Sequence, residues 1–176
     1  MRIVLLFLAL AGCIKTAAVQ QAAQPAPVAL TTVLESTESP GLQSIPDGVS
    51  SRLSEQVRAR GLVPQSVDGA TTTGNSTDTR LTWLAESASG AQVLMLIETE
   101  ARFSVQVNGR YRWNVDATLT LAHADGSADP QTSTVSAPVA LVYAHQDEED
   151  ALLEASPLIA RRLGIMLDAW IASGQL

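Results

Sequence analysis

The sequence predicts an α+β domain: a small mixed sheet with a long bulged hairpin, and helices packed on one face. Three observations support this prediction. Apolar and polar residues alternate over residues 91–122, two segments before this stretch repeat apolar residues at helical spacing, and a longer helical pattern follows it to the C-terminus. A period of two indicates half-buried strands, and a period near 3.6 indicates amphipathic helices. Helices laid on one face of a mixed sheet bury these apolar sides together.

The first predicted elements are a strand and a helix. Residues 28–35 (VALTTVLE) are rich in apolar and β-branched side chains and predict a strand, whereas residues 36–45 contain Ser, Pro and Gly and predict a loop. Pro46 is tolerated in the first turn of a helix, and Gly61 supplies the signal that ends it. The apolar stripe of this helix consists of Val49, Leu53 and Val57.

A short strand and a second helix come next. Residues 62–67 predict a strand, which Pro64 confines to an edge or a strand start because proline lacks an amide donor. Residues 68–75 are polar and predict a loop. A second helix is expected to begin near residues 76–78 and to end at Gly90. Its stripe consists of Leu81, Leu84, Ala85 and Ala88.

The alternating stretch predicts two strands that turn at Asn108-Gly109. Core side chains occupy odd positions in both arms, and directly paired residues share a face of a sheet. A two-residue loop would pair odd with even positions. We therefore expect a three-residue loop, Val107–Gly109, in which Gly109 forms a bulge. The resulting register pairs Phe103 with Trp113 and Val105 with Tyr111.

A third alternating strand and a long helix complete the domain. Residues 135–143 alternate, and Pro138 suits an outer strand or a bulge. The acidic cluster Asp147–Asp150 precedes the last helix, where negative charge complements the helix dipole. Ser156-Pro157 predicts either a fresh helix start or a kink. The apolar stripe consists of Leu152, Ala155, Ile159, Leu163, Met166 and Trp170.

The charge of the chain limits its partners. Acidic residues outnumber basic ones, 18 to 11, which gives a formal net charge of −7. Repulsion from phosphates, with no basic stripe to offset it, argues against a nucleic-acid partner. The same charge argues against attraction to anionic lipid surfaces.

The N-terminus has the order of an export signal: Arg2, then an apolar run over residues 3–10, then small residues. The run is too short to span a bilayer, which needs about 20 residues. The sequence Leu10-Ala11-Gly12-Cys13 resembles the lipobox of bacterial lipoproteins, and this resemblance implies cleavage before Cys13 and lipid on that residue. Cys13 is also the only cysteine, so lipidation accounts for a thiol that has no disulfide partner within the chain.

The lipobox resemblance also divides the chain. Residues 1–12 are expected to form a signal peptide, residues 13–27, rich in Ala, Gln and Pro, a disordered tether, and residues 28–176 a single domain. In lipoproteins, an aspartate directly after the lipidated cysteine favours the inner membrane. Ile14 stands at that position, so the resemblance implies an outer-membrane anchor with the domain facing the periplasm.

The order of elements, with Gly90-Ala91-Gln92-Val93-Leu94 leading from a helix into the hairpin, resembles a group of envelope lipoprotein domains. The group includes the amino-terminal domain of TolB, the lipoprotein activators of penicillin-binding proteins and the curli secretion lipoprotein. Its pattern has an acidic residue where this chain has Gln92. The resemblance covers about residues 28–173 and implies a non-catalytic module that docks another envelope protein. The lipopolysaccharide-assembly lipoprotein, which plugs an outer-membrane barrel, is similar in pairing a lipobox with two helices and a small sheet.

No residue pattern predicts catalysis, a cofactor or a metal. His123 and His145, the only histidines, lie in or beside expected turns and are interpreted as solvated loop residues. Zinc, nucleotide and nucleophile-elbow motifs are absent, and residues 125–129 lack the full ligand set of a calcium loop. The polar face of the hairpin is expected to carry exposed ion pairs, because acid–base catalysis needs a desolvated pocket that separates the pKa values. These residues are Glu98, Glu100, Asp116, Arg102 and Arg112.

The sequence therefore predicts a lipid-anchored accessory or adaptor protein of the outer membrane that docks an envelope protein complex and is not an enzyme. The alternative is a subunit of an oligomeric secretion pore or an assembly plug for an outer-membrane barrel. That alternative predicts stable rings or a co-purifying barrel, whereas the adaptor is expected to be monomeric once Cys13 is changed to Ser. A third hypothesis, a glycan or ester hydrolase, needs a cleft of convergent polar groups around Glu98, Glu100 or His145. The sequence leaves the oligomeric state open.

Overall fold

The computed structural model describes residues 26–36, 41–43, 45–72 and 74–175. The expected signal peptide, Cys13 and most of the expected tether lie outside these residues. Within them, no helix is both long enough and apolar enough to cross a membrane.

The described residues form six strands and three α-helices in one mixed sheet with helices against it. The strands are β1 (Pro27–Glu35), β2 (Leu42–Gln43), β3 (Val63–Ser66), β4 (Val93–Val107), β5 (Arg110–His123) and β6 (Gln131–Leu141). The helices are α1 (Asp47–Arg58), α2 (Thr77–Ser87) and α3 (Glu148–Ala172), with a short 3-10 helix at Gly69–Thr71. The α+β class expected from the sequence is confirmed.

The strand order is β2-β1-β4-β5-β6. β3 lies off this path and pairs with the first part of β1. β1 runs parallel to β3 and β4, and the other neighbours are antiparallel. The two prolines lie where their missing amide donors predict: Pro64 in the short edge strand β3, and Pro138 in the outer strand β6. Among the strands of the described residues, β2 alone was not expected, and its two residues pair with the end of β1.

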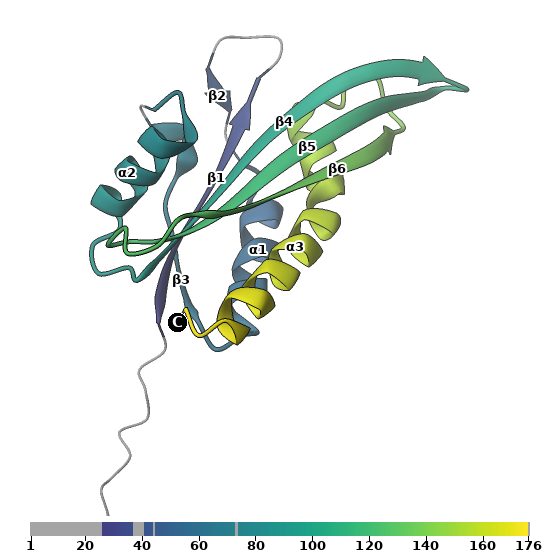
Figure 1. Ribbon diagram of the computed structural model, residues 1–176. Coiled ribbons are helices and arrows are strands. Elements are labelled where there is room, and N and C mark those ends of the chain that lie inside the picture. Colours follow the sequence, from purple (N-terminus) through teal and green to yellow (C-terminus); the bar gives the residue numbers. More distant parts are fainter. Residues whose placement is uncertain (1–25, 37–40, 44, 73, 176) are drawn as a thin grey trace, which may run out of the picture.

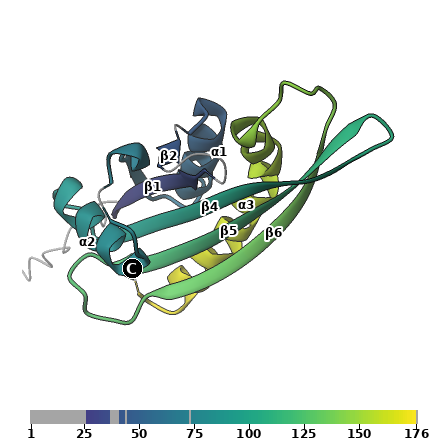
Figure 2. The same ribbon diagram turned by 90° about the horizontal axis from the view of Figure 1, so that it is seen from above.

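The helices cover both faces of the sheet. α1 and α3 lie side by side against one face (Figures 1 and 2), whereas α2 packs on the opposite face, where Leu81 and Leu84 belong to the same cluster as Ala29 and Leu96. α2 thus departs from the expectation that all helices share one face. The reason lies in β1 and β4, which run parallel and carry apolar residues on both sides of the sheet.

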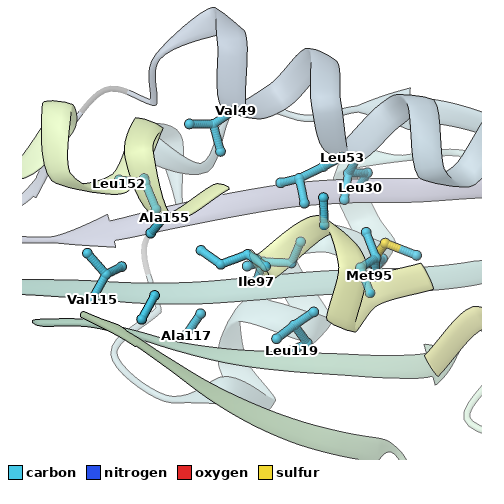
Figure 3. Packing of buried hydrophobic residues seen from close by; sticks show 14 of the residues in the cluster. Leu30, Val49, Leu53, Met95, Ile97, Val115, Ala117, Leu119, Leu152 and Ala155 are labelled. Atoms are coloured by element: carbon cyan, nitrogen blue, oxygen red, sulfur yellow. The ribbon is translucent and has the colours of Figure 1, made fainter. Parts of the chain in front are cut away.

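The main core lies between the sheet and the α1–α3 pair (Figure 3). Leu53 of α1, Ile97 of β4 and Leu152 of α3 belong to this core and are fully buried. Burying an aliphatic side chain of this size contributes about 1.5–3 kcal/mol relative to leaving it exposed. The apolar stripes predicted for the first and last helices are therefore the surfaces that fix them to the sheet.

α3 continues through Pro157 without a break. Proline has no N–H to donate to the carbonyl of Leu153, four residues earlier. The Ser156 hydroxyl donates to that carbonyl oxygen at 2.6 Å, and the Arg52 guanidinium donates to Ser156 Oγ. A neighbouring side chain thus supplies the bond that proline removes, and a fresh helix start at this point is excluded.

The hairpin turns at Asn108-Gly109 through a two-residue loop, not the expected three-residue one. The φ angles of the two residues are +51° and +71°. Positive φ at both central positions is the signature of a type I′ turn, whose twist matches that of the flanking strands. The local preference of the Asn-Gly pair therefore decides the turn.

The extra residue that lets odd positions pair with odd positions lies within β4 and not in the turn. The observed pairs are Phe103–Trp113 and Val105–Arg112, with the register shift between them. Phe103 therefore has its expected partner, but the expected pairing of Val105 with Tyr111 is wrong. Ser104 is the inserted residue of a β-bulge. The side chains that follow it in β4 therefore lie on the opposite face of the sheet from the one that unbroken alternation would give them.

Deleting Ser104 is expected to change the free energy of unfolding by less than about 1 kcal/mol, because the flanking pairs already have the register of an unbulged hairpin. Deleting Ala101 instead is expected to cost at least about 3 kcal/mol, since it moves Phe103 to the opposite face and removes a buried residue. Urea unfolding followed by circular dichroism measures both. Equal losses for the two deletions would contradict the bulge.

Candidate functional site

The tip of the β4–β5 hairpin gathers several exposed apolar side chains. β4 is 15 residues long, about 50 Å at about 3.3 Å per residue, and the tip projects past the helices (Figures 1 and 2). At the other end of β4, the Gln92 amide donates to the Pro27 carbonyl at 2.9 Å, close to where the described chain begins. The exposed apolar side chains of the tip and the adjoining loop are Phe103, Val105, Val107, Val142 and Tyr143.

One side of the tip, opposite the face that α1 and α3 cover, is apolar and basic. After the bulge, Val105 and Val107 pair with Arg112 and Arg110, so these four side chains share that face. They line a hollow of about 440 Å³ together with Pro138 and Ala140 of β6. Among the described residues, neither arginine forms an ion pair with a carboxylate. We call this surface the tip groove.

The other side of the tip is aromatic. Phe103 lies 5.7 Å from Trp113 and 6.4 Å from Tyr111, measured between ring centroids, with interplanar angles of 68° and 43°. The three rings line a second hollow, of about 530 Å³, against the start of α3. The indole N–H of Trp113 is buried and donates to no group within the described part of the chain. We call this surface the aromatic hollow.

Carboxylates close the aromatic hollow. Asp147 caps α3, accepting hydrogen bonds from the amides of Glu149 at 3.0 Å and Asp150 at 3.3 Å, which confirms the expected role of the acidic cluster as a helix start. Glu148 is buried and accepts a hydrogen bond from the Gln43 side chain at 2.6 Å. Asp147, Glu148, Gln43 and His145 all line the hollow.

The predicted ion pairs on the polar face of the hairpin are present in part. Arg102 Nε donates to Glu100 Oε1 at 2.7 Å, and the Arg102 guanidinium lies 3.9 Å from an Asp116 carboxylate oxygen. The hydrogen bond from Arg102 holds the pKa of Glu100 below its usual value. Arg112 takes no part and lies in the tip groove instead. An exposed pair of this kind contributes little to stability, because water screens the two charges.

Glu98 belongs to a different, buried cluster centred on Arg80. The Arg80 guanidinium lies 2.6 Å from Glu98 and 2.7 Å from Glu35, and its Nε donates to the Gly74 carbonyl at 3.0 Å. Burial lowers the pKa of Arg80, but hydrogen bonds and charge from the two glutamates outweigh it and raise the pKa above its ordinary value. The cluster joins α2 to β1 and β4.

The Arg80 cluster is not predicted from the sequence, because hydrophobic periodicity treats an arginine as a surface residue. A signal was nevertheless present. Arg80 precedes Leu84 and Ala88 at spacings of four and eight, so it lies on the buried side of α2.

The two histidines lie apart from one another. His123 ends β5 and packs against Trp170, with ring centroids 5.0 Å apart, and is half-buried rather than solvated as expected. His145 is a loop residue that stacks on Tyr143 at 5.5 Å.

In the turn after β5, hydrogen bonds from Ser127 hold the pKa of Asp125 below its usual value. Within the described ranges, no group of three or more His, Cys, Asp or Glu side chains is placed to hold a metal ion.

No family model and no curated protein matches the sequence. Solved structures with a similar arrangement include the PelC dodecamer from Paraburkholderia phytofirmans, at 18% identity and a TM-score of 0.45 over 81% of this chain and 89% of that one. Lipoprotein GNA1162 from Neisseria meningitidis has 13% identity and a TM-score of 0.44, covering 85% of this chain and 97% of that one. Rare lipoprotein B from Shewanella oneidensis has 10% identity and a TM-score of 0.31, covering 83% and 94%. Bacterial lipoproteins are thus among the solved structures with an arrangement similar to that of this chain.

Proposed function

We propose that this protein is a bacterial envelope lipoprotein, anchored in the outer membrane by lipid on Cys13 and facing the periplasm. Its role is non-catalytic: it docks another envelope protein through the tip groove. Lipidation of this kind places two or more acyl chains on one cysteine. Such an anchor is lasting, whereas a single acyl chain binds a membrane only marginally. The support for the anchor is the sequence Leu10-Ala11-Gly12-Cys13 after an apolar run.

The observation that carries the docking proposal is the tip groove itself. Val105 and Val107 are 44% and 37% exposed and lie beside two arginines that have no carboxylate partner within the described residues. A lone exposed valine is ordinary, but apolar side chains gathered beside uncompensated charge on a projecting hairpin are typical of an interaction site. The chemistry fits a protein surface with apolar side chains rimmed by carboxylates, because like charges across an interface cost several kcal/mol.

One experiment tests the anchor and the docking site together. A photo-crosslinking amino acid replaces Val107 in intact cells, and the same amino acid at Thr134 serves as the control on the same face of the sheet. We expect a discrete crosslinked product from position 107 only. In the Cys13→Ser background we expect incorporation of labelled fatty acid to be lost and the product to fall at least fivefold, because the domain is no longer held beside its partner.

The mass of the product identifies the occupant. A product between this chain and a different envelope protein supports the adaptor. A product whose mass is a multiple of this chain overturns it in favour of the oligomeric-pore alternative. Equal products from positions 107 and 134 contradict the tip groove, and fatty-acid label retained in Cys13→Ser contradicts the anchor.

A further inference from the structure

The aromatic hollow lies on the opposite side of the hairpin tip from the tip groove, and the proposed docking role does not use it. Its rings are not stacked into a closed core. Phe103 is 49% exposed, Tyr111 is half-buried, the rings are tilted or edge-on to one another, and all three line the hollow. A hollow of about 530 Å³ is the size of an ordinary small-molecule site.

The polar groups that line this hollow are acidic or neutral. Asp147 and Glu148 contribute carboxylates, and neither a lysine nor an arginine lines the hollow among the described residues. Asp147 and Glu148 open a run of four carboxylates, Asp147–Asp150, at the start of α3. The helix N-terminus offsets only about half an elementary charge of that run. The hollow therefore combines aromatic rings with negative charge.

We propose that the aromatic hollow binds an organic cation, an alkylammonium or a guanidinium group. Aromatic rings attract a cation that lies within about 6 Å of the ring centroid, because the ring faces carry the negative part of the quadrupole. The carboxylates of Asp147 and Glu148, which line the same hollow, add direct attraction. Anionic ligands are disfavoured by the same carboxylates, and a purely apolar ligand gains nothing from them.

This inference is independent of the tip groove, because its ligand is tested without any partner protein. The full chain is purified in a maltoside detergent, whose headgroup is uncharged, and titrated at constant ionic strength and constant pH. The readouts are the indole N–H signal of Trp113, assigned with Trp113→Phe, and the amide signals of the His145 loop. The probes are choline, L-argininamide and 3,3-dimethylbutan-1-ol, which has the shape of choline without its charge.

We expect saturable shifts with choline or L-argininamide, and affinity for the uncharged alcohol at least tenfold weaker. Binding of choline points to a free quaternary ammonium compound as the source of the cation, and binding of L-argininamide alone points to a basic side chain of a docked protein. Phe103→Leu and Glu148→Gln are expected to weaken binding at least fivefold each. Trp83→Leu, which removes a ring from α2 on the opposite face, is expected to leave it unchanged.

Three results would overturn the proposal. One is the absence of saturable shifts with either cation while the wild-type spectrum is that of a folded protein. Another is equal affinity for choline and the uncharged alcohol, which would make the hollow a merely apolar site. The last is unchanged cation affinity in both Phe103→Leu and Glu148→Gln.

Discussion

Arg80→Met is expected to lower the free energy of unfolding by about 3–5 kcal/mol, the usual cost of removing one partner from a buried ion pair. Arg80 is 5% exposed and makes its ion pairs with Glu98 and Glu35. The Glu98 side chain is only 15% exposed, so without the guanidinium its carboxylate loses its counter-ion in a place that water reaches poorly. Thr77 still donates to Glu98 at 2.8 Å, but a neutral hydroxyl does not replace the charge.

Urea unfolding of matched variants separates this cost from simple loss of side-chain packing. Arg80→Met combined with Glu98→Gln is expected to recover at least about 1 kcal/mol of the loss, because no uncompensated charge then remains buried. Arg102→Met, which breaks an exposed ion pair with Glu100, is expected to cost far less than Arg80→Met, because water screens the exposed pair. An Arg80→Met variant as stable as Arg102→Met would show that the cluster does not hold α2 to the sheet.

The contrast between these arginines shows what the sequence could predict. Hydrophobic periodicity sorts residues by polarity, and it predicts the α1 and α3 stripes, the long hairpin and the edge strands because apolar burial decides them. It predicts that Glu98 forms exposed ion pairs. The strand pattern does not indicate that Arg80, 18 residues earlier on α2, is buried and contacts Glu98. The position of α2 on the opposite face depends on that long-range contact and on the two apolar sides of β1 and β4.

The sequence does not predict the tip groove, for a different reason. Val105 and Val107 occupy odd positions, so an unbroken alternation places them on the face that the helices cover. The preference of Asn108-Gly109 for a two-residue turn moves the inserted residue to Ser104 and turns both valines to the open face. One local backbone choice therefore decides which side chains the tip exposes, and the periodicity of the sequence is the same for both outcomes.

Trp170→Ala is expected to lower the free energy of unfolding by about 3–5 kcal/mol, as large-to-small changes of a buried aromatic residue do. Trp170 is fully buried in the last turns of α3, where it packs against His123 and donates its indole N–H to the Gln175 carbonyl at 3.2 Å. Truncation leaves a cavity between α3 and the end of β5. Trp170→Phe retains most of the ring and is expected to cost less than half as much.

The position of Trp170 makes this variant a test of whether stability and docking are separate. Trp170 packs against His123, the last of the 14 residues of β5. The hairpin tip lies at the other end of that strand, 13 residues earlier. At a temperature where Trp170→Ala remains folded, crosslinking from position 107 is therefore expected to match the wild type. Loss of the crosslink in a folded Trp170→Ala protein would mean that the tip groove depends on the far end of the sheet. A loss of stability below about 1 kcal/mol would mean that Trp170 is not the buried residue that the structure places there.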